Sequence, residues 1–289
     1  MTRPTPGTDP VATFAPGLFA GRTALVTGGG TGIGRRTAVA MARLGADVVV
    51  AGRDLPRLQE TVEDLRRTQQ ENGYGDARAE AHAVNIRDVS EVERLREETL
   101  RRFGAVDFLV NNAGGQFPAP PSKISDNGWR SVVDLNLTGT WNMLSRFMTP
   151  MSEAGYGAIV NVVHIYSLER GAPYFVHSGA ARAGVVNLTR SLAPYLAPHG
   201  VTVNALAPGT VDTMGFLDNE ARPMGLVGER GEEHLRSTAA RRMGTPDEVA
   251  ATIVYLCSPA ARFVTGAVLV ADGGEFYGNW PQVWEPGTL

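Results

Sequence analysis

The sequence predicts an α/β fold in which helices cover both faces of a doubly wound parallel sheet of seven strands. Short continuous apolar runs alternate with segments that are apolar at helical spacing, and this alternation is typical of βαβ units. A glycine-rich segment, residues 28–34, lies between the first apolar run and the first helical pattern. No internal repeat or shift in composition marks a second domain within the 289 residues.

Most strands are predicted from short continuous apolar runs, because parallel strands are buried on both faces. The runs lie at residues 23–27, 47–51, 79–84, 106–111, 158–163, 202–206 and 267–270. Helical patterns separate them near residues 32–44, 55–71, 89–103, 127–151, 178–196 and 246–257.

Three segments fall outside this alternation. Residues 1–16 are rich in Pro and Thr, so we expect a flexible arm before a single domain over 17–289. Residues 210–241 follow a strand at the carboxyl edge of the sheet, where a ligand-covering lid belongs; a plain surface excursion is the alternative. The tail, 275–289, carries Trp280 and Trp284 and is expected to pack at an interface or on the lid.

The composition excludes several classes of protein. The chain is 43% hydrophobic and has a net charge of −3, so we expect neither a nucleic-acid nor a membrane surface. The single cysteine, Cys257, excludes an internal disulfide and leaves no cysteine cluster for zinc. We expect a protein of the reducing cytoplasm that binds no metal.

The glycine-rich segment predicts a phosphate-binding loop of the Rossmann type. Glycine lets a pyrophosphate approach the backbone without meeting a Cβ atom, and the N–H groups at the helix start point at the phosphates. The spacing Thr-Gly-x-x-x-Gly-x-Gly favours nucleotide binding over an ordinary strand–helix turn. The predicted contacts are Gly28, Thr31, Gly32, Ile33 and Gly34.

The end of the second strand favours NADP(H). Sites that prefer NAD carry an acid there for the ribose 2′-hydroxyl, whereas here Gly52 takes that place and Arg53 follows. The Arg53 guanidinium can hold a 2′-phosphate through two parallel hydrogen bonds, and Arg35 and Arg36 can add charge. A solvated Arg53 is the alternative. Asn85, after the third strand, is placed to bind adenine or to form a turn.

Further motifs make the chain resemble the short-chain dehydrogenase/reductase family over about residues 17–274. They are Asn111-Asn112-Ala113-Gly114, Asn136 and Pro208-Gly209, joined to the glycine-rich segment. The resemblance implies a homotetramer and a catalytic role for Asn136. It also implies cofactor contacts from Asn112, Ala113, Gly114, Pro208, Gly209, Thr210 and Thr213. A face of small residues on the helix 178–196 would permit close contact between copies: Gly179, Ala180, Ala183 and Gly184.

The chain departs from the family at the catalytic residues. Ordinary members carry a Ser and then Tyr-x-x-x-Lys, but this chain has no Tyr-x-x-x-Lys. Alignment of the helix places Ser178 at the Tyr position and Arg182 at the Lys position. The surrounding pattern is similar to the trans-2-enoyl-CoA reductase branch. The related 2,4-dienoyl-CoA reductases place an active Tyr just after the fifth strand, where this chain has Tyr166.

These substitutions suit reduction of a C=C bond better than reduction of a ketone. Ketone reduction needs an acid of tuned pKa, and Arg cannot relay a proton because it stays charged. Reduction of a 2-enoyl thioester mainly needs hydrogen-bond donors to the thioester oxygen and a fixed nicotinamide. We therefore predict an NADPH-dependent reductase of an enoyl-CoA or carrier-protein-bound enoyl group. Tyr166 and Ser178 would be the donors, and Arg182 would hold the nicotinamide ribose.

Several alternatives stay open at this point. The protein can be an atypical ketone or alcohol oxidoreductase with a rearranged acid, or a non-catalytic NADP-binding protein. His164 or His177 can replace Tyr166 as the acid. Tyr166 can also be a structural aromatic, and Ser178 can be a helix cap.

Overall fold

A parallel sheet of seven strands lies at the centre of the computed structural model, which describes residues 9–228, 231 and 238–277. The strand order is β3-β2-β1-β4-β5-β6-β7, and all neighbouring pairs are parallel. The order reverses between β1 and β4, and a crevice forms outside the carboxyl ends of strands at such a point. The strands are β1 (Thr23–Thr27), β2 (Asp47–Gly52), β3 (Ala79–Ala83), β4 (Phe108–Asn111), β5 (Gly157–Val162), β6 (Val201–Pro208) and β7 (Val268–Ala271).

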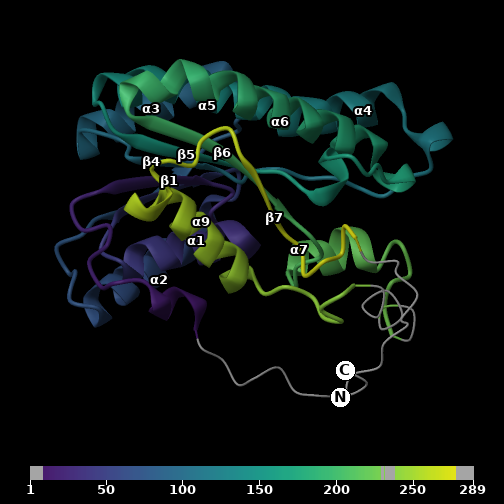
Figure 1. The fold of residues 1–289 in the computed structure, drawn as a ribbon, viewed down its shortest axis with the longest axis horizontal. Coiled ribbons are helices and arrows are strands. Elements are labelled where there is room, and N and C mark those ends of the chain that lie inside the picture. Colours follow the sequence, from purple (N-terminus) through teal and green to yellow (C-terminus); the bar gives the residue numbers. More distant parts are fainter. Residues whose placement is uncertain (1–8, 229–230, 232–237, 278–289) are drawn as a thin grey trace.

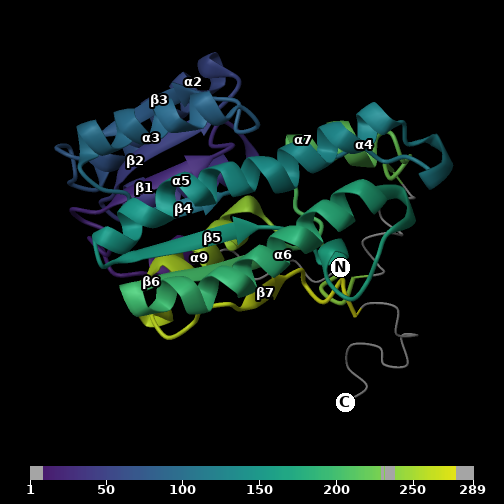
Figure 2. The same cartoon turned by 90° about the horizontal axis from the view of Figure 1, so that it is seen from above.

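Helices cover both faces of the sheet, as the alternating pattern predicts (Figures 1 and 2). One face carries α1 (Gly32–Arg43), α2 (Leu55–Glu71) and α9 (Pro246–Cys257). The other carries α3 (Val89–Phe103), α5 (Gly139–Glu153) and α6 (Val176–Leu196). Side chains of Asp54, Asp88 and Thr245 cap α2, α3 and α9, and each accepts a hydrogen bond from the first turn.

The single helix predicted over 127–151 is interrupted. The structure has α4 (Asp126–Val133), then a π-helical turn (Asp134–Thr138), then α5. Such turns occur frequently at functional sites. This one places Asn136 against the loop that follows β4, where its Nδ2 donates to Gly115 O at 2.7 Å and to Val132 O at 2.8 Å.

Each central strand supplies side chains to both apolar layers, because successive side chains of a strand point to opposite faces. In β1, fully buried Val26 joins the layer under α1, α2 and α9. Its neighbour Leu25 joins the layer under α3, α5 and α6. Burying one such side chain stabilises the fold by roughly 1.5–3 kcal/mol.

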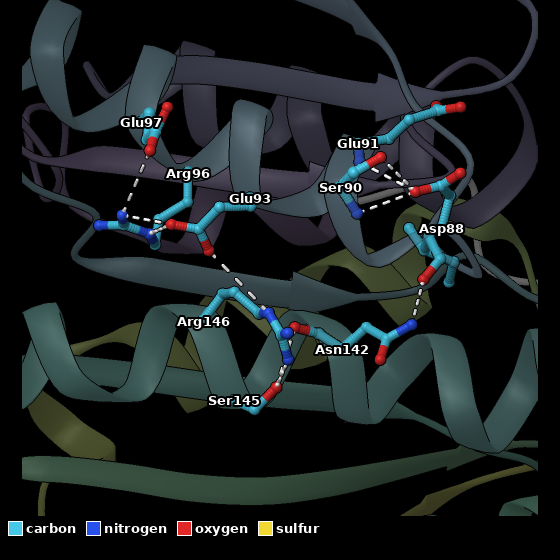
Figure 3. A network of polar contacts seen from close by, with 10 residues as sticks. Asp88, Ser90, Glu91, Glu93, Arg96, Glu97, Asn142, Ser145 and Arg146 are labelled. Atoms are coloured by element: carbon cyan, nitrogen blue, oxygen red, sulfur yellow. Dashed lines mark hydrogen bonds and ion pairs between the residues drawn. The ribbon is translucent and has the colours of Figure 1, made fainter.

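Polar contacts fix the helices relative to the loops that end the strands. Arg146 of α5 and Arg96 of α3 both approach the carboxylate of Glu93 (Figure 3). The Asn142 amide of α5 donates at 2.9 Å to the backbone oxygen of Ile86, just after β3. These contacts position the loop between β3 and α3, which contributes to the site described below.

The three irregular segments are described in part. Within the expected arm, a 3₁₀ turn (Pro10–Thr13) buries Val11 against α9, and Asp9 pairs with Arg43. The chain is therefore packed from Asp9 onward, and residues 1–8 of the expected arm lie outside the described residues. The lid segment contains α7 (Met214–Phe216) and a π-helical turn (Leu217–Ala221). Trp280 and Trp284 lie outside the described residues. Within those residues, the structure has no helix with the length and apolar character needed to cross a bilayer.

Candidate active site

Two joined cavities open at the carboxyl ends of β1 and β4. We name them the inner cavity, of about 500 Å³, and the outer cavity, of about 750 Å³. They share Gly28, Thr31, Ala113 and Gly114, so the glycine-rich loop lies between them. Other predicted cofactor residues line the inner cavity: Gly32, Ile33, Asn112, Arg182, Pro208, Gly209, Thr210 and Thr213. Arg53 and Asn85 line the outer cavity.

Gly34 packs beneath the loop and lines neither cavity. A Cβ atom there would lie 2.3 Å from the backbone oxygen of Gly28 and 2.4 Å from Nδ2 of Asn112. The same Nδ2 donates to Thr27 O at 3.0 Å, and Thr27 Oγ1 accepts from the backbone N–H groups of Asn112 and Ala113. The predicted Asn112 and Gly34 thus hold the loop in shape.

The start of α1 is suited to bind a phosphate. Thr31 is its N-cap residue, yet the Thr31 side chain accepts no capping hydrogen bond from the first turn. The N–H groups of that turn are left for another acceptor, and the helix dipole favours an anion there. Because the loop separates two cavities, these residues fit a dinucleotide whose pyrophosphate lies at the start of α1.

Two guanidinium groups lie at the outer cavity, which is lined by both Arg53 and Arg57. Asp54, the acid nearest the end of β2, caps α2 and lies 3.2 Å from Nε of Arg57. Arg57 was not predicted from the sequence, although it lies in the first turn of α2, only four positions after Arg53. Asn85 uses its Oδ1 to accept from the Arg87 backbone at 3.3 Å, as the turn alternative predicts.

The expectation that Arg35 and Arg36 add charge to the nucleotide site is wrong. Arg35 pairs with Asp64, and Arg36 pairs with Asp247 at 2.6 Å. Neither arginine lines either cavity. On α1 these side chains point toward the neighbouring helices α2 and α9 and are neutralised there.

Arg182 reaches the inner cavity from α6 and lies against Gly114. A Cβ at Gly114 would be 2.2 Å from Nη2 of Arg182 and 2.7 Å from Oδ1 of Asn136, so only glycine fits. One Arg182 nitrogen donates to Val162 O, while Nε has no partner among the described residues. Burial lowers the pKa of Arg182 to about 10, so the group remains a cation at neutral pH. The Arg182 side chain lines the inner cavity and can donate to a bound ligand there.

Tyr166 lines the same cavity and is held between aromatic rings. Its ring stacks on Phe175 at 5.8 Å between centroids, with 5° between the planes, and meets His164 edge-on at 5.4 Å. Burial raises the pKa of Tyr166 well above its usual value, and the charges of Glu275 and Glu220 raise it further. The phenol therefore keeps its proton and acts as a hydrogen-bond donor.

A chain of hydrogen bonds runs along the cavity wall. The Ser178 hydroxyl donates to Oε1 of Gln116 at 2.6 Å, and Nε2 of His164 lies 3.2 Å from Ser178 Oγ. Ser167 Oγ lies 2.9 Å from Nδ1 of His164. At its other end, the Gln116 side chain hydrogen-bonds Glu220, which lines the inner cavity.

Some predicted catalytic residues lie behind the cavity wall. Ser178 is fully buried, and neither it nor Asn136 lines a cavity. His177 is also fully buried; its Nδ1 accepts from the Ser178 backbone N–H at 2.9 Å, and its ring meets Phe117 edge-on. Of the two histidines considered as acids, His164 alone lines the inner cavity.

Sequence analysis missed three residues of the inner cavity as functional groups: Gln116, Glu220 and Glu275. Buried Glu275 accepts from the backbone N–H of Thr210 at 2.6 Å and from its hydroxyl at 3.1 Å. Asp272 orders this turn by accepting from the N–H groups of Gly274 and Phe276. No local sequence pattern predicts these contacts, because Glu275 hydrogen-bonds a residue more than sixty positions away.

The burial of the His164 imidazole leads us to expect that the folded protein loses stability in acid. Burial, aided by the Arg182 charge, lowers the His164 pKa from 6.5 to about 3. Between these values the unfolded chain binds the extra proton, so the stability from a neutral His164 is lost as the pH falls from 6.5 toward 3. At pH 5 the loss amounts to about 2 kcal/mol. In urea unfolding, His164→Gln should show a shallower pH dependence than the wild type, and His199→Gln on the surface should not. Parallel curves for wild type and His164→Gln would contradict this.

The chain matches known proteins along most of its length. A family model described as "Enoyl-(Acyl carrier protein) reductase" matches residues 28–275. The peroxisomal 2,4-dienoyl-CoA reductase of Pongo abelii, described as (3E)-enoyl-CoA-producing, is 33% identical over 91% of this chain and 86% of its own. A probable 2,4-dienoyl-CoA reductase of Bacillus subtilis is 30% identical over 90% and 98% of the two chains. The solved structure of a citronellol catabolism dehydrogenase from Pseudomonas aeruginosa is 38% identical over 91% and 98%, with a TM-score of 0.76. The chain therefore belongs to the short-chain dehydrogenase/reductase family and is an oxidoreductase.

Proposed function

We propose that this oxidoreductase uses NADPH to reduce a conjugated C=C bond in an enoyl thioester, carried by CoA or a carrier protein. The observation that carries the proposal is that Tyr166 and Arg182 line the same cavity. The phenol pKa is raised rather than lowered, and the arginine cation cannot release a proton at working pH. This pair stabilises negative charge on an oxygen but does not relay a proton, and enoyl reduction needs the former.

In this mechanism the protein holds the substrate oxygen and the cofactor. NADPH, when bound, supplies the hydride that is added to Cβ. Tyr166, whose hydroxyl hydrogen-bonds Glu275 in the free protein, turns that hydroxyl to the thioester oxygen as the oxygen becomes enolate-like, while Arg182 holds the nicotinamide ribose and supplies positive field. Ser178 acts indirectly by orienting Gln116, and Asn136 acts by supporting Gly115. Apolar Phe216, Met224 and Leu226 of the lid line the inner cavity and suit an acyl chain.

The relatives' names favour one substrate class in particular, since several of them are called 2,4-dienoyl-CoA reductases. A dienoyl thioester presents the same carbonyl oxygen to Tyr166, but a (3E)-enoyl product, as in the name of the Pongo abelii relative, requires the hydride at Cδ and the proton at Cα. NADPH oxidation should be measured with crotonyl-CoA, 2,4-hexadienoyl-CoA and acetoacetyl-CoA. Turnover of either unsaturated thioester supports the proposal. Turnover of acetoacetyl-CoA alone would assign a ketone reductase, and no turnover would favour a non-catalytic NADP-binding protein.

The outer cavity predicts a preference for NADPH over NADH. Arg53 and Arg57 can both pair with a 2′-phosphate, whereas Asp54 is engaged as a helix cap. We expect Arg53→Ala or Arg57→Ala to weaken NADPH binding by roughly 10–100-fold, since charge-assisted hydrogen bonds contribute about 1.5–3 kcal/mol. NADH affinity should hardly change. Arg36→Ala is the matched control, because Arg36 pairs with Asp247 away from the cavity. Dissociation constants from fluorescence titration decide the matter, and equal wild-type affinities for the two cofactors would refute the preference.

The position of Tyr166 predicts that its hydroxyl is the principal donor to the substrate oxygen. Tyr166→Phe removes only that hydroxyl, so kcat should fall by roughly 100-fold or more while the NADPH dissociation constant stays constant. Ser178→Ala should cost less, and Arg182→Ala should weaken cofactor binding as well as turnover. Tyr174→Phe serves as the control, because Tyr174 is exposed. Full activity in Tyr166→Phe with loss in His164→Gln would make the histidine the acid instead.

We also propose that the protein is a homotetramer of the cytoplasm. On α6, Ala180 and Ala183 are exposed and available to another copy. The other two residues of the predicted small-residue face pack internally, Gly179 against Tyr166 O and Gly184 against Leu137. Sedimentation at micromolar concentration should give four times the monomer mass, and a monomer would exclude the proposal.

A further inference from the structure

The proposed reaction leaves one step without an assigned residue. Hydride addition to Cβ produces an enolate, and a proton must then reach Cα. Tyr166 is used on the oxygen, and Arg182 keeps its proton. The proton then comes from water or from another titratable group at the inner cavity, and among the described residues three such groups line it: His164, Glu220 and Glu275.

His164 is excluded by its hydrogen bonds. The Ser178 proton points to Gln116, so Ser178 Oγ is an acceptor toward His164, and Nε2 of the imidazole must be the donor. Nδ1 then accepts from Ser167. This is a neutral imidazole with both nitrogens engaged, in agreement with a pKa lowered to about 3.

Glu275 is excluded by its partners. Its two carboxylate oxygens accept from the N–H and the hydroxyl of Thr210, at 2.6 and 3.1 Å. It also hydrogen-bonds Tyr166. Both of its oxygens are therefore already engaged as hydrogen-bond acceptors.

Glu220 has the surroundings that a proton donor needs. It comes from the lid, in the π-helical turn Leu217–Ala221, and lines the inner cavity together with Tyr166 and Arg182. In the hydrogen-bond chain, Ser167 donates to His164, His164 donates to Ser178, and Ser178 donates to the amide oxygen of Gln116. The amide N–H of Gln116 therefore donates to Glu220. One carboxyl oxygen is thereby held in place while the other can carry a proton into the cavity.

The charges around Glu220 come from every segment packed against it. Arg182 on α6 and the Gln116 amide after β4 favour the carboxylate, whereas Glu275 after β7 disfavours it. Burial is the largest influence, and the pKa of Glu220 is raised as a result. A carboxyl group with a raised pKa can serve as a general acid near neutral pH.

We propose that Glu220 is the acid that protonates Cα of the substrate, an assignment that rests on the proposed function. The Glu220 O–H bond breaks as the Cα–H bond forms, and the enolate electrons return to the C=O bond. Glu220 is left as a carboxylate and regains a proton from water before the next turnover. The net change is one hydride and one proton added across the C=C bond.

The test compares Glu220→Gln and Glu220→Asp with a control on the same segment. Asp218→Asn is that control, because Asp218 is exposed and pairs with Arg222 outside the cavity. With the best thioester, Glu220→Gln should lower kcat by roughly 100-fold or more, the usual contribution of general acid catalysis. Glu220→Asp should recover part of the loss. NADPH affinity should stay constant in all three variants.

Two further readouts separate an acid from a structural residue. The wild-type kcat should fall as the pH rises through the Glu220 pKa, because the protonated form of Glu220 is required. In Glu220→Gln, this fall of kcat with rising pH should be absent. In the protein without cofactor, infrared difference spectra should show a protonated carboxyl band that titrates over the same pH range. The band should be absent from Glu220→Gln and present in Asp218→Asn.

The outcomes distinguish this assignment from the proposed function. A wild type that turns over no unsaturated thioester overturns the proposed function, and this assignment with it. An active wild type refutes the assignment alone if Glu220→Gln keeps kcat within about threefold of it, far less than a general acid contributes. The assignment is also refuted if Glu220→Gln keeps the fall of kcat at high pH or keeps the protonated carboxyl band.

Discussion

The enclosed positive charge of Arg182 governs the chemistry of the inner cavity. Removing a guanidinium from water is costly unless opposite charge and hydrogen bonds compensate. Here Val162 O accepts from it, while Gly114 leaves the space that it occupies. The same charge helps to keep His164 neutral. A lysine at this position could exchange a proton with a neighbouring tyrosine, whereas an arginine supplies only field and hydrogen bonds.

The fold places these groups by bringing distant segments to one sheet edge. Tyr166 and His164 follow β5, Gln116 follows β4, and Glu275 follows β7. Parallel strands deliver all their carboxyl ends to the same edge, so the loops after them converge at the crevice. Buried hydrogen bonds fix the relative height of these strands: Asn111 of β4 donates to Asn161 of β5, which in turn donates to Thr189 of α6.

The π-helical turn Leu217–Ala221 and the turn after β7 complete the site with two carboxyl groups. Glu275 is held in place by Thr210 and by the Asp272 turn, and it hydrogen-bonds Tyr166. Glu220 accepts a hydrogen bond from Gln116, the last residue of the hydrogen-bond chain along the cavity wall. Two chemically identical side chains therefore have different surroundings, and surroundings of this kind can divide two carboxyl groups into an anion and an acid.

The sequence by itself determined the sheet, its helices and the nucleotide loop, because these follow from local periodicity and from the glycines between β1 and α1. Strand and helix bounds agree to within two residues outside the segment 127–151. The sequence also shows that the Tyr-x-x-x-Lys motif is absent, and this absence led to Tyr166 and Arg182 as the candidate catalytic residues. Only the tertiary structure decided that Arg35 and Arg36 face other helices, and that Ser178 lies behind Gln116. It alone brought Glu220 and Glu275 to the cavity, because their partners are distant in sequence and a carboxylate carries no local signal of the contacts it will make.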